Sequence, residues 1–371
     1  MAPILIFPRG GGRKNQIVFV HSQIKDQRKL QVYLLGLMLV ALLLDGFSLV
    51  AEAAQPQSVI EGARQEGKLL IYSLLAVPDH SKIVNRFKEK YPFIDVSLIR
   101  PGASERITAR VITEARAGRH LVDVIGVSRL NMFHLIQRGL VRSYESPERQ
   151  NFDVNFQDRQ GYWTAFYVNP EVMAYNTHMI PASAAPKNYQ DLLESRWKGK
   201  LVMEETAIEW FATLVRHWGE DKGLSYMRRL AGQELKMLRG NTLITQLIAA
   251  GEYAAAVSLN GPRVELTKRR GAPLDWVAPD PTVVDIVTLG IAAQAPHPNA
   301  AKLYLNHVLS KEVQEGLLED ELVKPSGRND VKSSFMAKIR AAQVQMIFVD
   351  EATGEQWERF EKRFQTIFHV P

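Results

Sequence analysis

Short buried strands alternate with amphipathic helices in the first half of the chain, and this pattern restricts the fold more than any other feature. Residues 68–73 (KLLIYS), 95–100 (DVSLIR) and 121–127 (LVDVIGV) have the apolar composition of buried strands. Apolar residues at helical spacing follow the first strand at 83–91 and the third at 129–138. Such alternation predicts a mainly parallel sheet with helices on both faces.

Two long β-type stretches suggest that the chain leaves this first unit and later returns to it. Residues 162–175 (YWTAFYVNPEVMAY) and 283–293 (VVDIVTLGIAA) flank a second α/β region, with predicted strands at 200–203 and 253–258. A length of 371 residues is enough for about two domains with cores of their own. We therefore predict an α/β protein of two hinged lobes.

One continuously apolar run lies near the N-terminus, at residues 32–44 (VYLLGLMLVALLL). Basic residues precede it at 25–29, and Ala-Glu-Ala follows at 51–53. This order predicts a signal peptide over 1–53 and a mature chain that begins near Ala54. The alternative is an uncleaved membrane anchor, but Asp45 and Gly46 interrupt the run before it reaches the length of a membrane span.

Composition excludes several classes of protein. The chain has no cysteine, which excludes disulfide frameworks, thiolate zinc sites, iron–sulfur clusters and cysteine nucleophiles. The formal net charge is +6, but the leader holds six basic and three acidic residues, so the mature chain carries only +3. A charge this small, without interleaved basic and aromatic residues, does not indicate nucleic-acid binding.

Sequence signatures of catalysis are also missing. There is no Gly-x-Ser-x-Gly elbow, no His-Glu-x-x-His, no phosphate-loop lysine and no glycine-rich dinucleotide fingerprint. The nine histidines are scattered along the chain. We therefore expect neither enzyme activity nor a cofactor, and a secreted hydrolase is the least favoured interpretation.

Three stretches resemble the periplasmic solute-binding proteins of ABC importers, in the branch that includes the ferric-ion-binding proteins. They are 175–177 (YNT), 188–201 (NYQDLLESRWKGKL) and 295–314 (APHPNAAKLYLNHVLSKEVQ). Within them we expect Trp197 to be a core residue and His297 to cap or pack a helix end. The resemblance covers roughly residues 57–345.

The resemblance implies a type II periplasmic binding protein fold, in which two α/β lobes are joined by a hinge of two crossing strands. We assign 54–165 and 290–345 to lobe 1, and 166–289 and 346–371 to lobe 2. The implied function is capture of a small polar or anionic organic solute by lobe closure and its delivery to an ABC permease in the inner membrane. The protein is expected in the periplasm as a monomer. A partner that presents the ligand to a membrane sensor is the alternative.

Ligand contacts are expected at strand ends and helix N-termini, where free backbone N–H groups and the helix dipole favour polar groups. Ser104 is also a candidate N-cap. The full set of expected contacts is Ser73, Gly102, Ser104, Ser128, Tyr167, Thr206, Trp210, Asn260 and Arg263. Among them, Ser104, Thr206 and Arg263 are expected to contact the same ligand.

The charge of the ligand stays open at this point. Three arginines favour an anion: Arg100, Arg106 and Arg263. Three glutamates cluster near one predicted helix start: Glu204, Glu205 and Glu209. The glutamates either interact with the helix dipole or point into the cleft, where they would suit an amine or a cation. Glu205 and Glu209, one turn apart, are expected on the same helix face.

Iron is the main alternative ligand, because of the ferric-binding branch of the resemblance. Those relatives commonly use two adjacent tyrosines in the segment that corresponds to 257–263, which here reads VSLNGPR. Two further matching positions hold Ala76 and Ser128, which are poor ligands for a hard metal ion. We therefore expect weak ferric-ion binding and no metal site.

Overall fold

The computed structural model describes residues 56–319 and 322–370. The predicted signal peptide and the start of the mature chain lie outside these residues. Within the described part, no helix has both the length and the apolar character needed to cross a membrane.

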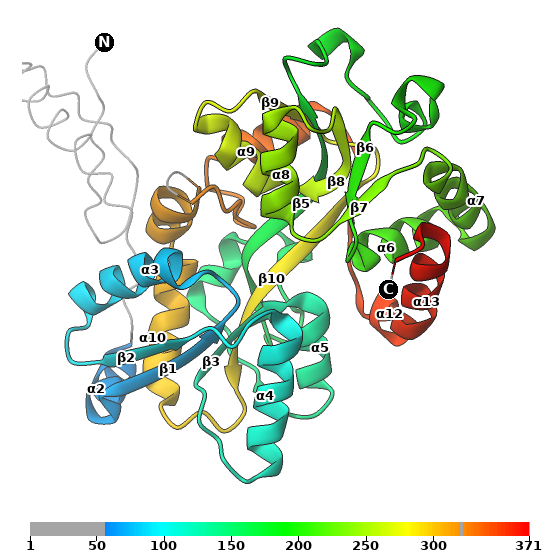
Figure 1. Ribbon diagram of the computed structural model, residues 1–371. Coiled ribbons are helices and arrows are strands. Elements are labelled where there is room, and N and C mark those ends of the chain that lie inside the picture. Colours follow the sequence, from blue (N-terminus) through cyan, green and yellow to red (C-terminus); the bar gives the residue numbers. More distant parts are fainter. Residues whose placement is uncertain (1–55, 320–321, 371) are drawn as a thin grey trace, which may run out of the picture. The chain divides into compact units, whose positions relative to one another are not determined.

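Lobe 1 begins with a parallel sheet, as the sequence predicts. β2 (Asp95–Ile99), β1 (Lys68–Ser73) and β3 (Val124–Ser128) lie side by side in that order. The helices of this lobe are α2 (Gln57–Glu66), α3 (Val77–Lys90), α4 (Ser104–Arg116), α5 (Arg129–Ile136) and α10 (Pro298–Leu309) (Figure 1). The short strand β4 (Val141–Arg142) pairs with β10.

Two long antiparallel strands, β5 (Thr164–Asn176) and β10 (Thr282–Ala292), occupy the middle of the strand order β2-β1-β3-β10-β5-β8-β6-β7 (Figure 1). β10 pairs with β3 and with the first half of β5, whereas β5 pairs with β8 and β9 from Glu171 onward. Both strands therefore take part in both lobes, which confirms the predicted two-lobe architecture. The predicted lobe boundaries fall inside these strands and stay predictions.

Lobe 2 repeats the mixture of parallel strands and covering helices. Its strands are β6 (Leu201–Glu204), β7 (Lys236–Leu238), β8 (Ala255–Asn260) and β9 (Leu274–Val277), and β6 is parallel to both β7 and β8. Its helices are α6 (Ile208–Trp218), α7 (Glu220–Ala231), α8 (Asn241–Ala250) and α9 (Gly261–Arg269).

Short helical turns and the C-terminal segment complete the fold. The turns are η1 (Pro147–Asn151), η2 (Val154–Phe156), η3 (Ala182–Ala184), η4 (Asp191–Leu193), η5 (Ser195–Trp197) and the π-helical η6 (Val313–Glu319). They are followed by α11 (Ser334–Ala341), β11 (Met346–Phe348), α12 (Glu351–Glu355) and α13 (Trp357–Phe368). Phe364 of α13 packs edge-on against Phe211 of α6, with ring centroids 5.5 Å apart, so the C-terminal helix closes the core of lobe 2 (Figure 1).

The stretches that resemble the solute-binding proteins contribute residues to the core and to a helix end. Trp197 is buried in the lobe 2 core, as expected. His297 is the N-cap residue of α10; its backbone N–H donates to Asp123 Oδ1 at 2.7 Å, and its Nδ1 lies 3.0 Å from Asp123 Oδ2. His297 thus occupies the N-cap position of α10, but its side chain makes no capping hydrogen bond and contacts Asp123 instead.

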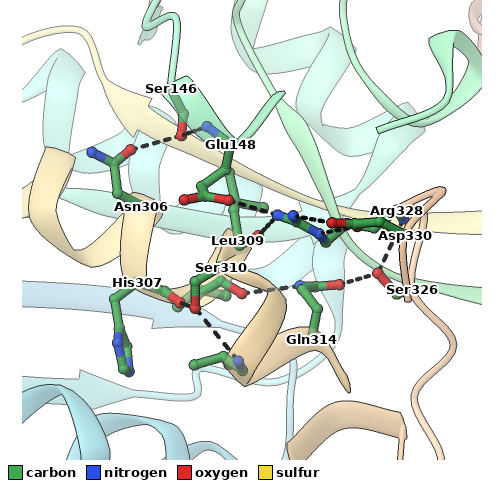
Figure 2. A network of polar contacts seen from close by, with 12 residues as sticks. Ser146, Glu148, Asn306, His307, Leu309, Ser310, Gln314, Ser326, Arg328 and Asp330 are labelled. Atoms are coloured by element: carbon green, nitrogen blue, oxygen red, sulfur yellow. Dashed lines mark hydrogen bonds and ion pairs between the residues drawn. The ribbon is translucent and has the colours of Figure 1, made fainter. Parts of the chain in front are cut away.

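A buried ion-pair network fixes the segment that follows η6 against lobe 1 (Figure 2). The Arg328 guanidinium, 3% exposed, donates to Glu148 at 2.7 Å, to the Leu309 carbonyl at 2.6 Å and to both carboxylate oxygens of Asp330 at 2.8 and 2.9 Å. Pro325, in the same segment, accepts a hydrogen bond from the Val168 N–H at 2.8 Å. The network therefore holds residues 324–330 beside β5.

Candidate ligand-binding site

A cavity of about 150 Å³ lies beside the crossing strands, where β6 ends and α6 begins. Thr206 and Trp210, both expected ligand contacts, line it. Four carboxylates from four different elements also line it: Glu171 (β5), Glu204 (β6), Glu209 (α6) and Asp285 (β10). We call this space the acidic cavity.

Two of the carboxylates are held by hydrogen bonds from lobe 2. Glu204 accepts hydrogen bonds from the Thr206 hydroxyl at 3.1 Å and from the Gly240 N–H at 2.8 Å. Glu171 accepts one from the Ser258 hydroxyl at 2.8 Å. Because its oxygens are already engaged, Glu204 serves mainly to shape the cavity wall.

The other two carboxylates have few partners. Asp285 accepts only a long hydrogen bond, 3.5 Å, from the Asn169 Nδ2 among side chains of the described residues. Glu209 has no hydrogen-bond donor or cation beside it in this part of the chain. Asn169 is itself 8% exposed, and its Oδ1 has no donor. Glu209 and the Asn169 Oδ1 therefore lack donors among the described residues, and Asp285 keeps room for a further one.

Burial raises the pKa of every carboxyl group in the cavity. It raises the pKa of Glu171 to about 7, and the charges of Asp285 and Glu204 act in the same direction. It raises the pKa of Asp285 to about 6, assisted by Glu105. Burial, followed by the charges of Asp285, Glu105 and Glu171, holds the pKa of Glu209 well above its usual value. Because Glu105 belongs to α4, lobe 1 also contributes to this negative field.

Glu205 differs from its neighbours, and its expected placement is wrong. α6 begins only at Ile208, so Glu205 precedes the helix and does not share a helix face with Glu209. Glu205 lines a separate hollow of about 250 Å³, and one of its carboxylate oxygens lies 3.9 Å from Arg239 Nε. Glu205 is therefore a neighbouring acidic residue that lies outside the acidic cavity.

The expected contacts of lobe 1 lie together but outside the cavity wall. Ser73 and Ser128 end the adjacent strands β1 and β3, and Ser104 Oγ accepts a hydrogen bond from the Ser128 N–H at 2.9 Å. Ser104 is the first residue of α4 and Ala103 is its N-cap, so the N-cap candidacy of Ser104 is wrong. Gly102 has a φ of 144°, and a Cβ there would lie 2.7 Å from Arg106 Cδ. This loop therefore requires glycine.

The remaining expected contacts are Tyr167, Asn260 and Arg263. The Asn260 side chain caps α9 by accepting from the Arg263 N–H at 3.2 Å, and its own N–H donates to Asn241, a residue of the cavity wall. The Arg263 guanidinium has no ion-pair partner among the described residues. Tyr167 is buried under Lys324, whose Nζ lies 4.9 Å from the ring centroid.

Lys324 was not expected from the sequence. Burial, and then the positive charge of Arg263, lowers the pKa of Lys324 to about 8. Its position depends on the Arg328 network a few residues later (Figure 2). A positive group is thus held near Tyr167, whereas the cavity wall in lobe 2 is negative.

Glu171 and Asp285 were also missed, although the sequence holds a signal for both. Each is an ionisable residue inside a long β-type run that is otherwise apolar. A charge is rarely placed in such a strand without a partner, because its burial is unfavourable. A lone ionisable residue within such an apolar run is therefore the signal that marks both positions.

The carboxylates of the cavity are not arranged as a metal site. Across residues 56–319 and 322–370, no three His, Cys, Asp or Glu side chains converge closely enough to hold a metal ion. The expected weakness of ferric-ion binding stays a prediction.

Comparison with known proteins gives the family. The family model of the bacterial extracellular solute-binding proteins matches residues 120–342, more than half of the chain. A Salmonella typhimurium protein named "Putative 2-aminoethylphosphonate-binding periplasmic protein" is 25% identical over 171 residues, 43% of this chain and 50% of the relative. The "Probable ABC transporter periplasmic-binding protein y4fP" of Sinorhizobium fredii is 27% identical over 115 residues. That match covers 31% of this chain and 32% of the relative, so the chain spans half or less of these relatives.

Solved structures agree on the fold. The periplasmic binding protein AfuA from Actinobacillus pleuropneumoniae, with fructose 6-phosphate bound, superposes with a TM-score of 0.68 at 22% identity, over 82% of this chain and 99% of AfuA. Iron-bound HitA from Pseudomonas aeruginosa gives a TM-score of 0.70 at 17% identity, over 81% and 99%. The two-lobe fold and the match to the family model agree, and this chain belongs to the bacterial extracellular solute-binding protein family.

Proposed function

We propose that this protein is the periplasmic substrate-binding component of an ABC importer. In this account the signal peptide over 1–53 is cleaved, the mature chain captures a small polar or anionic organic solute, and the loaded form delivers it to a permease in the inner membrane. The observation that carries the proposal is the acidic cavity, a polar space beside the two strands shared by both lobes. The protein acts as a binder, without a catalytic step.

Lobe closure is the proposed mechanism. β5 and β10 connect the lobes, so small changes along these strands move one lobe against the other. A solute that contacts both lobes favours the closed state by the difference between its affinities for the two states. Ser73, Gly102, Ser104 and Ser128 supply the lobe 1 contacts in this proposal. Thr206, Trp210, Asn260 and Arg263 supply those of lobe 2, and Tyr167 lies between the two sets.

Native mass spectrometry of the protein purified from a periplasmic extract tests this function. We expect a non-covalent mass excess from a retained small solute, because a closed cleft releases its ligand slowly. Calorimetry of the stripped protein with that solute should then show binding at one site. Protein that retains nothing, and that binds nothing from a concentrated periplasmic small-molecule fraction, would contradict the proposal.

Arg263→Ala is the variant that this calorimetry should include. Loss of a charge-assisted contact costs about 1.5–3 kcal/mol, which lowers affinity by roughly one to two decades. The Arg263 side chain makes no ion pair in the described structure, so the melting temperature without ligand should hardly change. Arg196→Ala, which removes an exposed pair with Glu194, is the control and should leave affinity unchanged. Unchanged affinity in Arg263→Ala would remove Arg263 from the site.

A further inference from the structure

We propose that the solute carries a protonated amine, and that this ammonium group binds in the acidic cavity between Glu171, Glu209 and Asp285. The inference rests on the proposed function and adds the chemical class of the ligand to it.

Unused hydrogen-bond acceptors are the first line of support. Glu209 has no donor among the described residues, and Asp285 has only the 3.5 Å hydrogen bond from Asn169 and one from the backbone N–H of Ile286. Asn169 is 8% exposed, and its Oδ1 has no donor. A buried acceptor such as the Asn169 Oδ1 is normally satisfied, whereas the half-buried carboxylates of Glu209 and Asp285 open onto the cavity. An ammonium group offers three N–H donors and no acceptor, which is the complement that these oxygens require.

Charge is the second line of support. The ionisable groups that act on Glu209 are Asp285, Glu105 and Glu171, and Glu105 also acts on Asp285. Within the described residues, no lysine or arginine is among these groups. Buried carboxylates are normally paired with a cation or neutralised. A ligand that brings one positive charge supplies the missing partner.

The arrangement also favours an organic ammonium over a metal ion. Metal ligands must converge on one point at about 2–2.6 Å, and no three carboxylates of the described chain do so. An ammonium group tolerates wider spacing, because each hydrogen bond extends to about 2.8–3.0 Å and the attached chain fills the remaining volume. A cavity of about 150 Å³ has room for this group and for part of its carbon chain.

Glu105 links ligand binding to lobe closure. It lies on α4 in lobe 1, whereas Glu209 lies on α6 in lobe 2, and their negative charges repel. Without ligand this repulsion opposes closure. An ammonium group between the two carboxylates turns repulsion into attraction from both sides.

Calorimetry with matched pairs of compounds tests the inference. Each pair consists of an amine and its deamino analogue: β-alanine and propionate, taurine and ethanesulfonate, O-phosphoethanolamine and ethyl phosphate. The solute retained on native purification is tested beside them. We expect an amine in the retained solute, and at least a tenfold advantage of the amine over its analogue in any pair that binds.

Three variants complete the design. Glu209→Gln and Asp285→Asn should reduce the amine advantage to below threefold, whereas Glu205→Gln, outside the cavity, should preserve it. An amine-free retained solute, equal affinity within the binding pairs, or an undiminished advantage in both cavity variants would overturn the ammonium assignment and leave solute capture intact. If no compound binds and no solute is retained, the proposed function fails as well.

Discussion

Arg328→Met should lower the free energy of unfolding by about 3–5 kcal/mol, the typical result of removing one partner from a buried ion pair. The Arg328 side chain is 3% exposed and that of Glu148 is 9% exposed, so the change leaves the Glu148 carboxylate buried without its cation. The Leu309 carbonyl loses its 2.6 Å donor at the same time. Chemical denaturation monitored by tryptophan fluorescence measures the effect.

Two further variants separate this loss from a general effect of removing charge. Arg328→Lys keeps the charge but cannot reproduce the forked contact with Glu148 and Asp330, so it should recover only part of the stability. Arg196→Ala removes an exposed pair with Glu194, an exposed hydrogen bond to the Ala184 carbonyl and a contact over the Trp197 ring, and should change stability by about 1 kcal/mol or less. If Arg328→Met were as mild as Arg196→Ala, the network in Figure 2 would not anchor residues 324–330.

Asp285→Asn should stabilise the unliganded protein at pH 8 by about 1–3 kcal/mol. Burial raises the pKa of Asp285 from 3.8 to about 6, so above that pH the folded state holds a carboxylate in an unfavourable environment. The amide has nearly the same shape and carries no charge. Stability and ligand affinity are thus expected to change in opposite directions at this residue.

The raised pKa of Asp285 also decides how the stability of the folded protein depends on pH. Between the unfolded and folded pKa values the folded state binds more protons, so wild-type stability falls as the pH rises. Glu171 and Glu209, whose pKa values are also raised, contribute in the same direction. The unliganded melting temperature should therefore decline from pH 5 to pH 8, and the decline should be smaller in Asp285→Asn.

Asp275→Asn is the matched control for this prediction. Burial alone would raise the pKa of Asp275, but hydrogen bonds from Lys268 and Lys338 hold it below its usual value. The control should therefore lower stability at pH 8. An Asp285→Asn protein that is destabilised at pH 8, or a wild-type melting temperature that rises over this range, would contradict the account of the acidic cavity.

Much of the fold follows from local sequence pattern. The apolar runs at 162–175 and 283–293 predict β5 and β10, and their position around a second α/β region predicts two lobes. Thr206 and Trp210, which line the acidic cavity, were expected as contacts because they lie at the start of the helix that follows the predicted strand at 200–203.

The set of residues that lines the acidic cavity could not be predicted from local pattern, because the pairing register of the strands determines which residues meet there. Register places Glu171 opposite Asn260 in the β5–β8 pair, and Asp285 opposite Asn169 in the β10–β5 pair. Glu105 approaches from the other lobe. Residues so far apart in the chain meet only through tertiary structure. Likewise, the placement of Lys324 depends on Arg328 and its buried partners, which no local pattern indicates.

Small-angle X-ray scattering tests lobe closure, the central claim, most directly. The stripped protein is measured before and after the solute that it retained on purification is added back. The account predicts a smaller radius of gyration when the solute is added, as the lobes close on it. Glu209→Gln, measured at the same solute concentration, should show a smaller fraction of the closed form. An unchanged radius of gyration at saturating solute would contradict capture by lobe closure.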